Sequence, residues 1–195
     1  MKAQGKHYHP LQIGVHWLTL RLRIAVDALI ELRDIYPKGS AAHDLMKTWH
    51  FMLGLTVFAL VLIRLPLRWV LHAPPITPAP PAWQNRLAHA MHWTLYGFLI
   101  VMPLLGWLTL SAKGQSIPFF GLGLPALIGP DKATAKSLEN LHELIGNVGY
   151  ALIGLHAAAA LWHHHVMRDD TLERMLPLAA RRPDRAAQAR LHRPS

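Results

Sequence analysis

The sequence predicts an all-α membrane protein, a bundle of four transmembrane helices with both termini on the cytoplasmic side. The 195-residue chain is 52% hydrophobic but only 16% charged, whereas a typical soluble domain is about 25% charged. Three long stretches carry no formal charge, and a further apolar segment precedes them. Lys and Arg are also distributed unequally between the two ends of these segments, which indicates an orientation in a bilayer.

The first predicted helix, residues 11–32, is the most polar of the four because it contains Arg21, Arg23 and Asp27. Arg23 and Asp27 are four residues apart, so they share a helical face and we expect them to neutralise each other. Arg21 must then face protein, water or an anionic ligand group if this helix crosses a membrane.

The other three predicted helices are built on uncharged stretches, and a bilayer span needs about 20 apolar residues. A run of five prolines between residues 73 and 82 separates two of them and predicts an extended spacer. Residues 1–177 form the predicted membrane domain, and residues 178–195 form a basic, flexible cytoplasmic tail. The three helices are expected at residues 48–66, 87–112 and 141–167.

The chain is basic, with a formal net charge of +9. Such a charge is typical of nucleic-acid-binding proteins, but the apolar composition favours cations at the cytoplasmic ends of membrane helices and no nucleic-acid partner. Four spans place twelve Lys and Arg on the side of the termini and six on the other side. The absence of cysteine excludes disulfides, cysteine-ligated iron–sulfur clusters and covalently attached haem.

Four of the fourteen histidines fall at two matching depths of the predicted bundle. His16 lies near the cytoplasmic end of the first helix, and His50 lies near the outer end of the second. His142 and His156 are fourteen residues apart on the fourth helix, about 21 Å along its axis and on nearly the same face. We therefore expect two stacked pairs, His50 with His142 on the periplasmic side and His16 with His156 on the cytoplasmic side.

Bis-histidine ligation of b-type haem is the economical interpretation of these pairs. Imidazole nitrogen is a common iron ligand, and a helical bundle can hold a flat porphyrin between facing helices. Gly54 and Gly146 follow His50 and His142 by four residues, and a helix face without a side chain lets a macrocycle approach. The alternative is that each histidine only bonds a backbone carbonyl or a neighbouring helix.

Three further histidines are candidates for a quinone site. His89 and His92 share a face at the start of the third helix, where either could instead replace His16 or His156 as a ligand. His163 lies two turns beyond His156, and its imidazole could pass protons to a quinone headgroup at neutral pH. His163 also begins a tract of three consecutive histidines, but consecutive side chains diverge by about 100° on a helix, so they cannot readily chelate one ion.

The basic residues expected at the outer end could attract an anion toward the outer haem. Lys113, Lys47 and Lys136 are the candidates. A merely soluble loop surface is the alternative interpretation of these lysines.

Four motifs of the chain occur together in one order. They are L-Q-I-G-V-H-W at 11–17, W-H-F-M-L-G at 49–54, R-L-A-H-A-M-H at 86–92 and H-E-L-I-G-N-V-G-Y-A-L-I-G-L-H-A-A-A-A-L-W-H-H at 142–164. These motifs resemble the bacterial cytochrome b-561 family. The resemblance covers residues 8–177 and implies a four-helix protein of the bacterial inner membrane with two non-covalent b haems. By motif position, the family's haem ligands fall on His16, His50, His142 and His156, and its quinone region falls near His163.

The resemblance implies an oxidoreductase that takes electrons from superoxide at the periplasmic face and gives them to ubiquinone in the membrane. No protein partner is required for that activity. A second hypothesis is a cytochrome b subunit that passes electrons between a partner dehydrogenase or hydrogenase and the quinone pool. A third is a histidine-based metal transporter, which would contain no haem. The charged residues of the first helix depart from the largely apolar family pattern.

Overall fold

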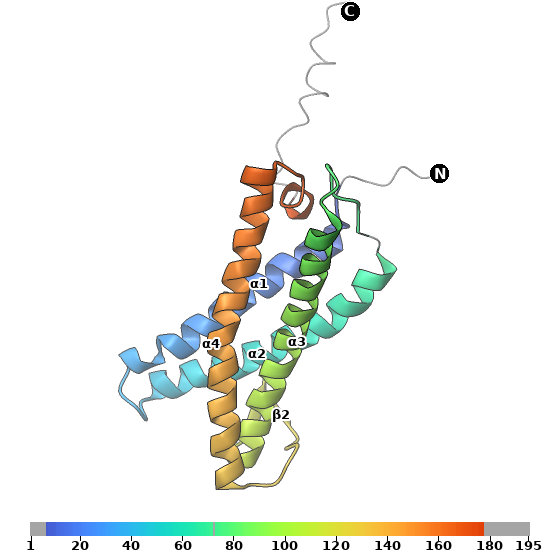
Figure 1. Ribbon diagram of the computed structural model, residues 1–195. Coiled ribbons are helices and arrows are strands. Elements are labelled where there is room, and N and C mark those ends of the chain that lie inside the picture. The colour runs from blue at the N-terminus through green and yellow to red at the C-terminus, as the bar shows by residue number, and fades with distance from the viewer. Residues whose placement is uncertain (1–6, 72, 178–195) are drawn as a thin grey trace, which may run out of the picture.

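The computed structural model describes residues 7–71 and 73–177, which form two helical hairpins (Figure 1). The first hairpin consists of α1 (Pro10–Glu31) and α2 (Ala41–Val70), and the second consists of α3 (Ala82–Ala112) and α4 (Lys132–Trp162). In Figure 1 the first hairpin slopes across the upright second hairpin, so residues from both can face each other inside the bundle. The all-α class predicted from the sequence is confirmed.

Three of the helical segments in the described part of the chain are long and apolar enough to cross a membrane. They are α2, α3 and the segment that runs from α4 through a short π-helix, η2 (His163–Met167). The 22-residue α1 is not among them, because Arg21, Arg23, Asp27 and Glu31 interrupt its apolar sequence. The expected pair inside this helix is present, with Nη1 of Arg23 2.6 Å from Oδ1 of Asp27.

The two ends of the described chain meet. The backbone N–H of Tyr8 donates to the carbonyl of Arg174 at 3.2 Å, and the indole N–H of Trp17 in α1 donates to the carbonyl of Met175 at 2.8 Å. Arg174 and Met175 belong to η3 (Glu173–Met175), a 3-10 turn that follows α4. The contact brings the start of α1 and the segment after α4 to the same end of the described bundle.

The cytoplasmic placement of the termini stays a prediction. It depends on Lys2, Lys6 and the arginines after residue 177, which lie outside the described residues, as does the expected basic tail, residues 178–195.

Helices α2 and α4 begin before the uncharged stretches that predicted them, because polar caps start them. Helix α3 also begins earlier, at Ala82 after Pro81, but without a side-chain cap. The side chain of Ser40 accepts from the backbone N–H of His43 at 3.3 Å at the start of α2. The carboxylate of Asp131 accepts from the N–H of Thr134 at 2.7 Å at the start of α4. Side-chain oxygens at this position satisfy backbone donors that the helix leaves unpaired. The first turns of these helices are therefore polar.

A small β-hairpin lies in the connection between α3 and α4, where no strand was predicted. Strand β1 (Ile117–Phe119) pairs antiparallel with β2 (Leu122–Leu124). The tight turn between them uses left-handed backbone at Gly121, with φ of 87°, a conformation that costs glycine little. Ile117 is 2% exposed and packs against Leu55 of α2 and Leu110 of α3, so the hairpin closes one end of the bundle.

The protein core is thin, as expected where lipid replaces water around apolar side chains. Among the described residues of α4, only Ala135 and Gly149 are buried. A side-chain Cβ at Gly149 would collide with the ring of Phe98 from α3, so this glycine permits the close approach of the two helices. Large exposed apolar side chains include Leu62, Ile63, Trp69, Leu144, Leu155 and Leu161.

Candidate functional site

The outer histidine pair is formed by His50 of α2 and His142 of α4, whose ring centroids lie 6.3 Å apart. Nδ1 of His50 donates to the backbone carbonyl of Val26 in α1 at 2.9 Å. A carbonyl only accepts, so the proton of His50 lies on Nδ1 and Nε2 keeps its lone pair. Such a second contact commonly fixes the tautomer and orientation of a metal-binding histidine.

His142 offers an unsatisfied nitrogen at the same level. The carbonyl of Met102 faces its ring, yet the buried Nδ1 makes no hydrogen bond of ordinary length and angle within the described structure. A buried ring nitrogen without a partner is costly, so this side chain has unused capacity to hold a proton donor or a metal.

A cavity that is partly open to the outside separates the helices around this pair. Its lining includes both histidines and two glycines, Gly54 of α2 and Gly106 of α3. A Cβ placed on Gly54 would meet nothing within 4 Å, and one placed on Gly106 would lie 3.5 Å from the ring of His142. The cavity therefore leaves room for a flat ligand beside the outer pair.

The inner level contains three imidazoles. The ring centroids of His16 and His156 lie 6.4 Å apart, and those of His92 and His156 lie 5.6 Å apart. Nη2 of Arg64 lies 2.9 Å from Nδ1 of His16. The structure thus brings His16 and His156 together, as expected, and adds His92 as a close neighbour of the same ring.

These spacings fit a metal held between two imidazoles. With metal–nitrogen bonds of about 2.0 Å and ring centres about 1.15 Å further out, two imidazoles that hold one metal between them have centroids about 6.3 Å apart. The separations of 6.3 and 6.4 Å match this value. Together with the glycine-lined cavity, they fit a haem at the outer level. They also make His16 with His156 a suitable inner pair.

No group of three or more His, Asp or Glu side chains comes together to hold a bare metal ion in the described part of the chain. The tract from His163 to His165 does not form such a site either.

The quinone candidates differ in their surroundings. His89 is exposed, and its Nδ1 donates to the carbonyl of Asn85 one turn back on α3 at 2.8 Å. His163 is half-buried, with Nδ1 2.5 Å from Oδ2 of Asp169. Of the three candidates, His92 lies nearest to His156, and only His163 pairs with a carboxylate.

Asp169 is 6% exposed and stays ionised in spite of its burial. Burial raises the pKa of its carboxyl group, but the hydrogen bonds from His163 and from the backbone N–H of Thr171, at 2.9 Å, outweigh that effect and hold the pKa below its usual range. The ionised carboxylate therefore fixes the orientation of the His163 imidazole.

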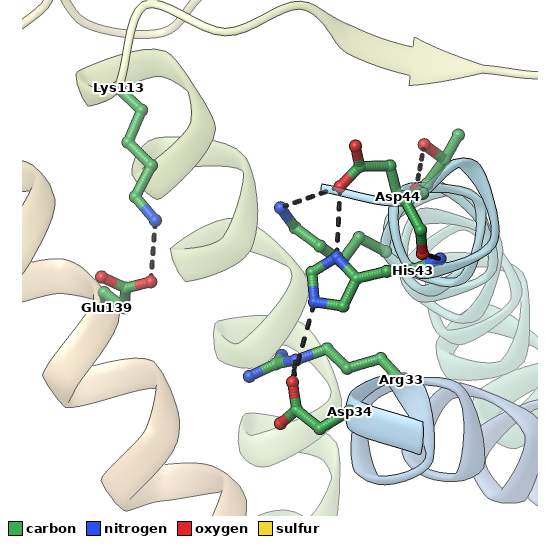
Figure 2. A network of polar contacts seen from close by, with 9 residues as sticks. Arg33, Asp34, His43, Asp44, Lys113 and Glu139 are labelled. Carbon is green, nitrogen blue, oxygen red and sulfur yellow. Dashed lines mark hydrogen bonds and ion pairs between the residues drawn. The ribbon is translucent and has the colours of Figure 1, made fainter. Parts of the chain in front are cut away.

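The three lysines expected to steer an anion are all paired with carboxylates. Lys113 at the end of α3 lies 2.7 Å from Glu139 of α4 (Figure 2), and Lys136 approaches the same carboxylate at 3.8 Å. Lys47 lies 3.9 Å from Asp44. Figure 2 also shows Asp44 beside His43, which lies 3.7 Å from Asp34. Two lysines sharing one carboxylate leave one positive charge in excess, so the outer field is weaker than the sequence suggested.

Two arginines that lie beside the histidine pairs, Arg64 and Arg23, have contacts that the sequence did not predict. Arg64 contacts His16 and lies over the ring of Tyr96 at 5.5 Å. Nothing in the sequence indicated the contact with His16, because it joins two helices, α1 and α2, across 48 positions of the chain. Arg23 was expected only to pair with Asp27, yet it also lines the outer cavity.

The sequence model of the family described as prokaryotic cytochrome b561 matches residues 7–178. The chain belongs to the prokaryotic cytochrome b561 family. Members of this family are haem b proteins of membranes that transfer electrons, and the resemblance noted from the motifs is confirmed.

Individual cytochrome b561 relatives match along most of their length. Cytochrome b561 homolog 1 of Escherichia coli is 39% identical over 166 residues, which cover 85% of this chain and 94% of that protein. The probable superoxide oxidase CybB of Yersinia pestis is 40% identical over 172 residues, covering 88% and 97%. Cytochrome b561 homolog 2 of Escherichia coli is 33% identical over 174 residues, covering 88% and 92%.

Proposed function

We propose that this cytochrome b561 protein holds two b haems and catalyses electron transfer from superoxide to ubiquinone across the bacterial inner membrane. The two stacked histidine pairs carry the proposal, because α4 contributes one imidazole to each pair, fourteen residues apart. That spacing corresponds to about 21 Å along the helix axis. Two haems at these depths would relay electrons through a layer that otherwise blocks them.

Haem b supplies reversible one-electron transfer when it is bound. The residues of the chain position it: His50 and His142 would hold the outer group, and His16 and His156 the inner one. The Val26 carbonyl keeps the His50 proton on Nδ1, so the other nitrogen is ready to bind a metal without a change of tautomer.

The overall reaction balances as two superoxide ions oxidised to two molecules of oxygen for each ubiquinone reduced to ubiquinol with two protons. The outer lysines would attract superoxide, since an excess positive charge remains beside Glu139. His163 with Asp169 would supply protons near the quinone, with His92 and His89 as the other candidate contacts. The similarity to a probable superoxide oxidase over 88% of the chain supports this choice of donor.

The test is haem stoichiometry followed by activity of the purified chain in detergent. A pyridine haemochrome assay is expected to give two haems per chain, and superoxide is expected to reduce a soluble ubiquinone analogue. His50→Ala should retain one haem and lose most of this activity, while His89→Ala serves as a matched histidine control for haem binding.

Two results would overturn the proposal. One is a haem-to-chain ratio well below two with full haem supply. The other is quinone reduction no faster than in His50→Ala, combined with a stoichiometric dehydrogenase or hydrogenase that co-purifies with the chain, which would establish the partner-subunit hypothesis instead.

A further inference from the structure

Arg23 is a buried cation in the wall of the outer cavity. It is 8% exposed and lines the cavity together with His50 and His142. Its Nη1 pairs with Asp27 at 2.6 Å, and its guanidinium lies over the ring of Phe98 at 5.1 Å. Nε of Arg23 is buried without a hydrogen bond in the described structure, so the ion pair with Asp27 leaves this N–H donor without an acceptor.

The position of Arg23 along α1 places it between the two histidine levels. It follows His16 by seven residues, about 10.5 Å along the axis, and precedes Val26, the acceptor of the His50 hydrogen bond, by three. On α4, Gly149 lies seven residues from both His142 and His156. Phe98 packs on Gly149 from one side and under Arg23 from the other, so these three residues form a layer midway through the bundle.

Asp27 only partly cancels the charge of Arg23 as seen from the cavity. The side chain of Arg23 is 10% exposed and that of Asp27 is 20% exposed, and Asp27 is not part of the cavity lining. The pair therefore presents its positive end to the cavity. Charges in a medium of low dielectric constant act strongly over such distances.

A cation beside a redox centre favours the state with one more electron. We propose that Arg23, held in place by Asp27, is a positioning residue that raises the reduction potential of the outer haem. Arg23 thereby sets the difference in reduction potential between the outer and inner haems, which decides on which haem the electron resides. This inference rests on the proposed function, because it requires a haem between His50 and His142.

The experiment is a spectroelectrochemical titration of the purified holoprotein, with the outer haem assigned by its absence from His50→Ala. Arg23→Leu is expected to shift the reduction equilibrium of the outer haem toward the oxidised state by about tenfold, about 59 mV for a one-electron couple. Asp27→Asn removes the opposing charge and is expected to shift the same equilibrium in the other direction. Arg23→Lys keeps the charge and should stay near wild type.

Arg21→Gln is the matched control, because Arg21 is an exposed arginine on the same helix. It is expected to leave both potentials unchanged. A general disturbance of packing would not move the potential in opposite directions for Arg23→Leu and Asp27→Asn, so the sign of the two shifts separates an electrostatic role from a structural one.

Equal potentials in wild type, Arg23→Leu and Asp27→Asn, or shifts of the same sign, would overturn the inference while leaving the two-haem function intact. A wild-type chain with fewer than two haems would overturn both. If Arg23→Leu does not fold, the potentials of the outer haem in Asp27→Asn and Arg23→Lys still test the proposal. An unchanged potential in Asp27→Asn contradicts it.

Discussion

The guanidinium of Arg64 lies 2.9 Å from Nδ1 of His16 and determines which nitrogen of that ring carries the proton. A guanidinium only donates hydrogen bonds, so Nδ1 accepts and, in the neutral ring, Nε2 holds the proton. If His16 holds a metal through Nε2, the proton of its ring would have to move to Nδ1, and Arg64 would have to donate to another acceptor. His50 needs no such change, because its Nδ1 already donates to Val26.

The first prediction concerns the choice between His16 and His92 at the inner level. We expect His16→Ala to lower the haem-to-chain ratio from two to one and His92→Ala to leave it at two, because the 6.4 Å separation of His16 and His156 fits a shared metal better than the 5.6 Å separation of His92 and His156. Haemochrome assays on both variants make the comparison. Loss of a haem in His92→Ala alone would reverse the assignment.

The second prediction concerns the charge at the outer end. Glu139→Gln leaves Lys113 and Lys136 without their shared carboxylate, so superoxide-driven quinone reduction should rise severalfold at low ionic strength, while Lys113→Gln should slow it. The difference should shrink as salt rises, because ions screen exposed charges. Glu173→Gln removes an equal charge from the other end of the bundle and should have no effect. A salt-independent rate in all variants would contradict steering.

The third prediction concerns the contact between Gly149 and Phe98. Gly149→Ala should lower the free energy of unfolding in detergent by about 1–3 kcal/mol, because the added methyl group collides with a buried ring. Gly154→Ala is the control on the same helix, since a Cβ there meets nothing within 4 Å; it should be neutral or stabilising. Thermal unfolding followed by circular dichroism measures both. Equal melting temperatures would show that the ring shifts at little cost.

The fourth prediction concerns pH and the pair of His163 and Asp169. Because the pKa of Asp169 is lowered in the folded protein, its stabilising effect is present above the unfolded value of about 3.9 and is lost as the pH falls through the lowered value. Asp169→Asn should therefore destabilise the protein at pH 7 by about 1–3 kcal/mol. The difference from wild type should disappear in strongly acidic buffer.

Melting temperatures of the wild type and Asp169→Asn, measured side by side across this range, test the fourth prediction. Asp44→Asn alters an exposed carboxylate and is the control for the loss of one negative charge. A difference between wild type and Asp169→Asn that grows on acidification would contradict the ionic pairing.

The helices and the two histidine pairs could be predicted from the sequence. The uncharged stretches predicted the helices, and the position of each histidine along its own helix predicted which histidines lie at the same depth. Fourteen residues on α4 put His142 and His156 on one face whatever surrounds them. The approach of His92 to His156 could not be predicted in the same way, since it depends on how closely α3 packs on α4, and that depends on the missing side chain at Gly149.

Contacts across chain segments explain the other differences. The pairing of Lys113 with Glu139 joins residues 26 positions apart, and a count of lysines gives no sign of it. The β-hairpin in the connection is only three residues long on each strand, too short for alternation to be visible. Arg23 marked its helix as unusual in the sequence, but only the crossing of the two hairpins places it beside the outer cavity.

The contacts of Trp17 and Tyr8 with the segment after α4 have a consequence for biosynthesis. A ribosome delivers α1 first, and α1 is the helix least suited to remain in a bilayer alone. Its partners, Arg174 and Met175, emerge only near the end of translation. Helix α2 already holds α1 through His50 and Arg64, but the contacts of Tyr8 and Trp17 form only after α4 has been made. A chain truncated before Arg174 would lack these last contacts of its first helix.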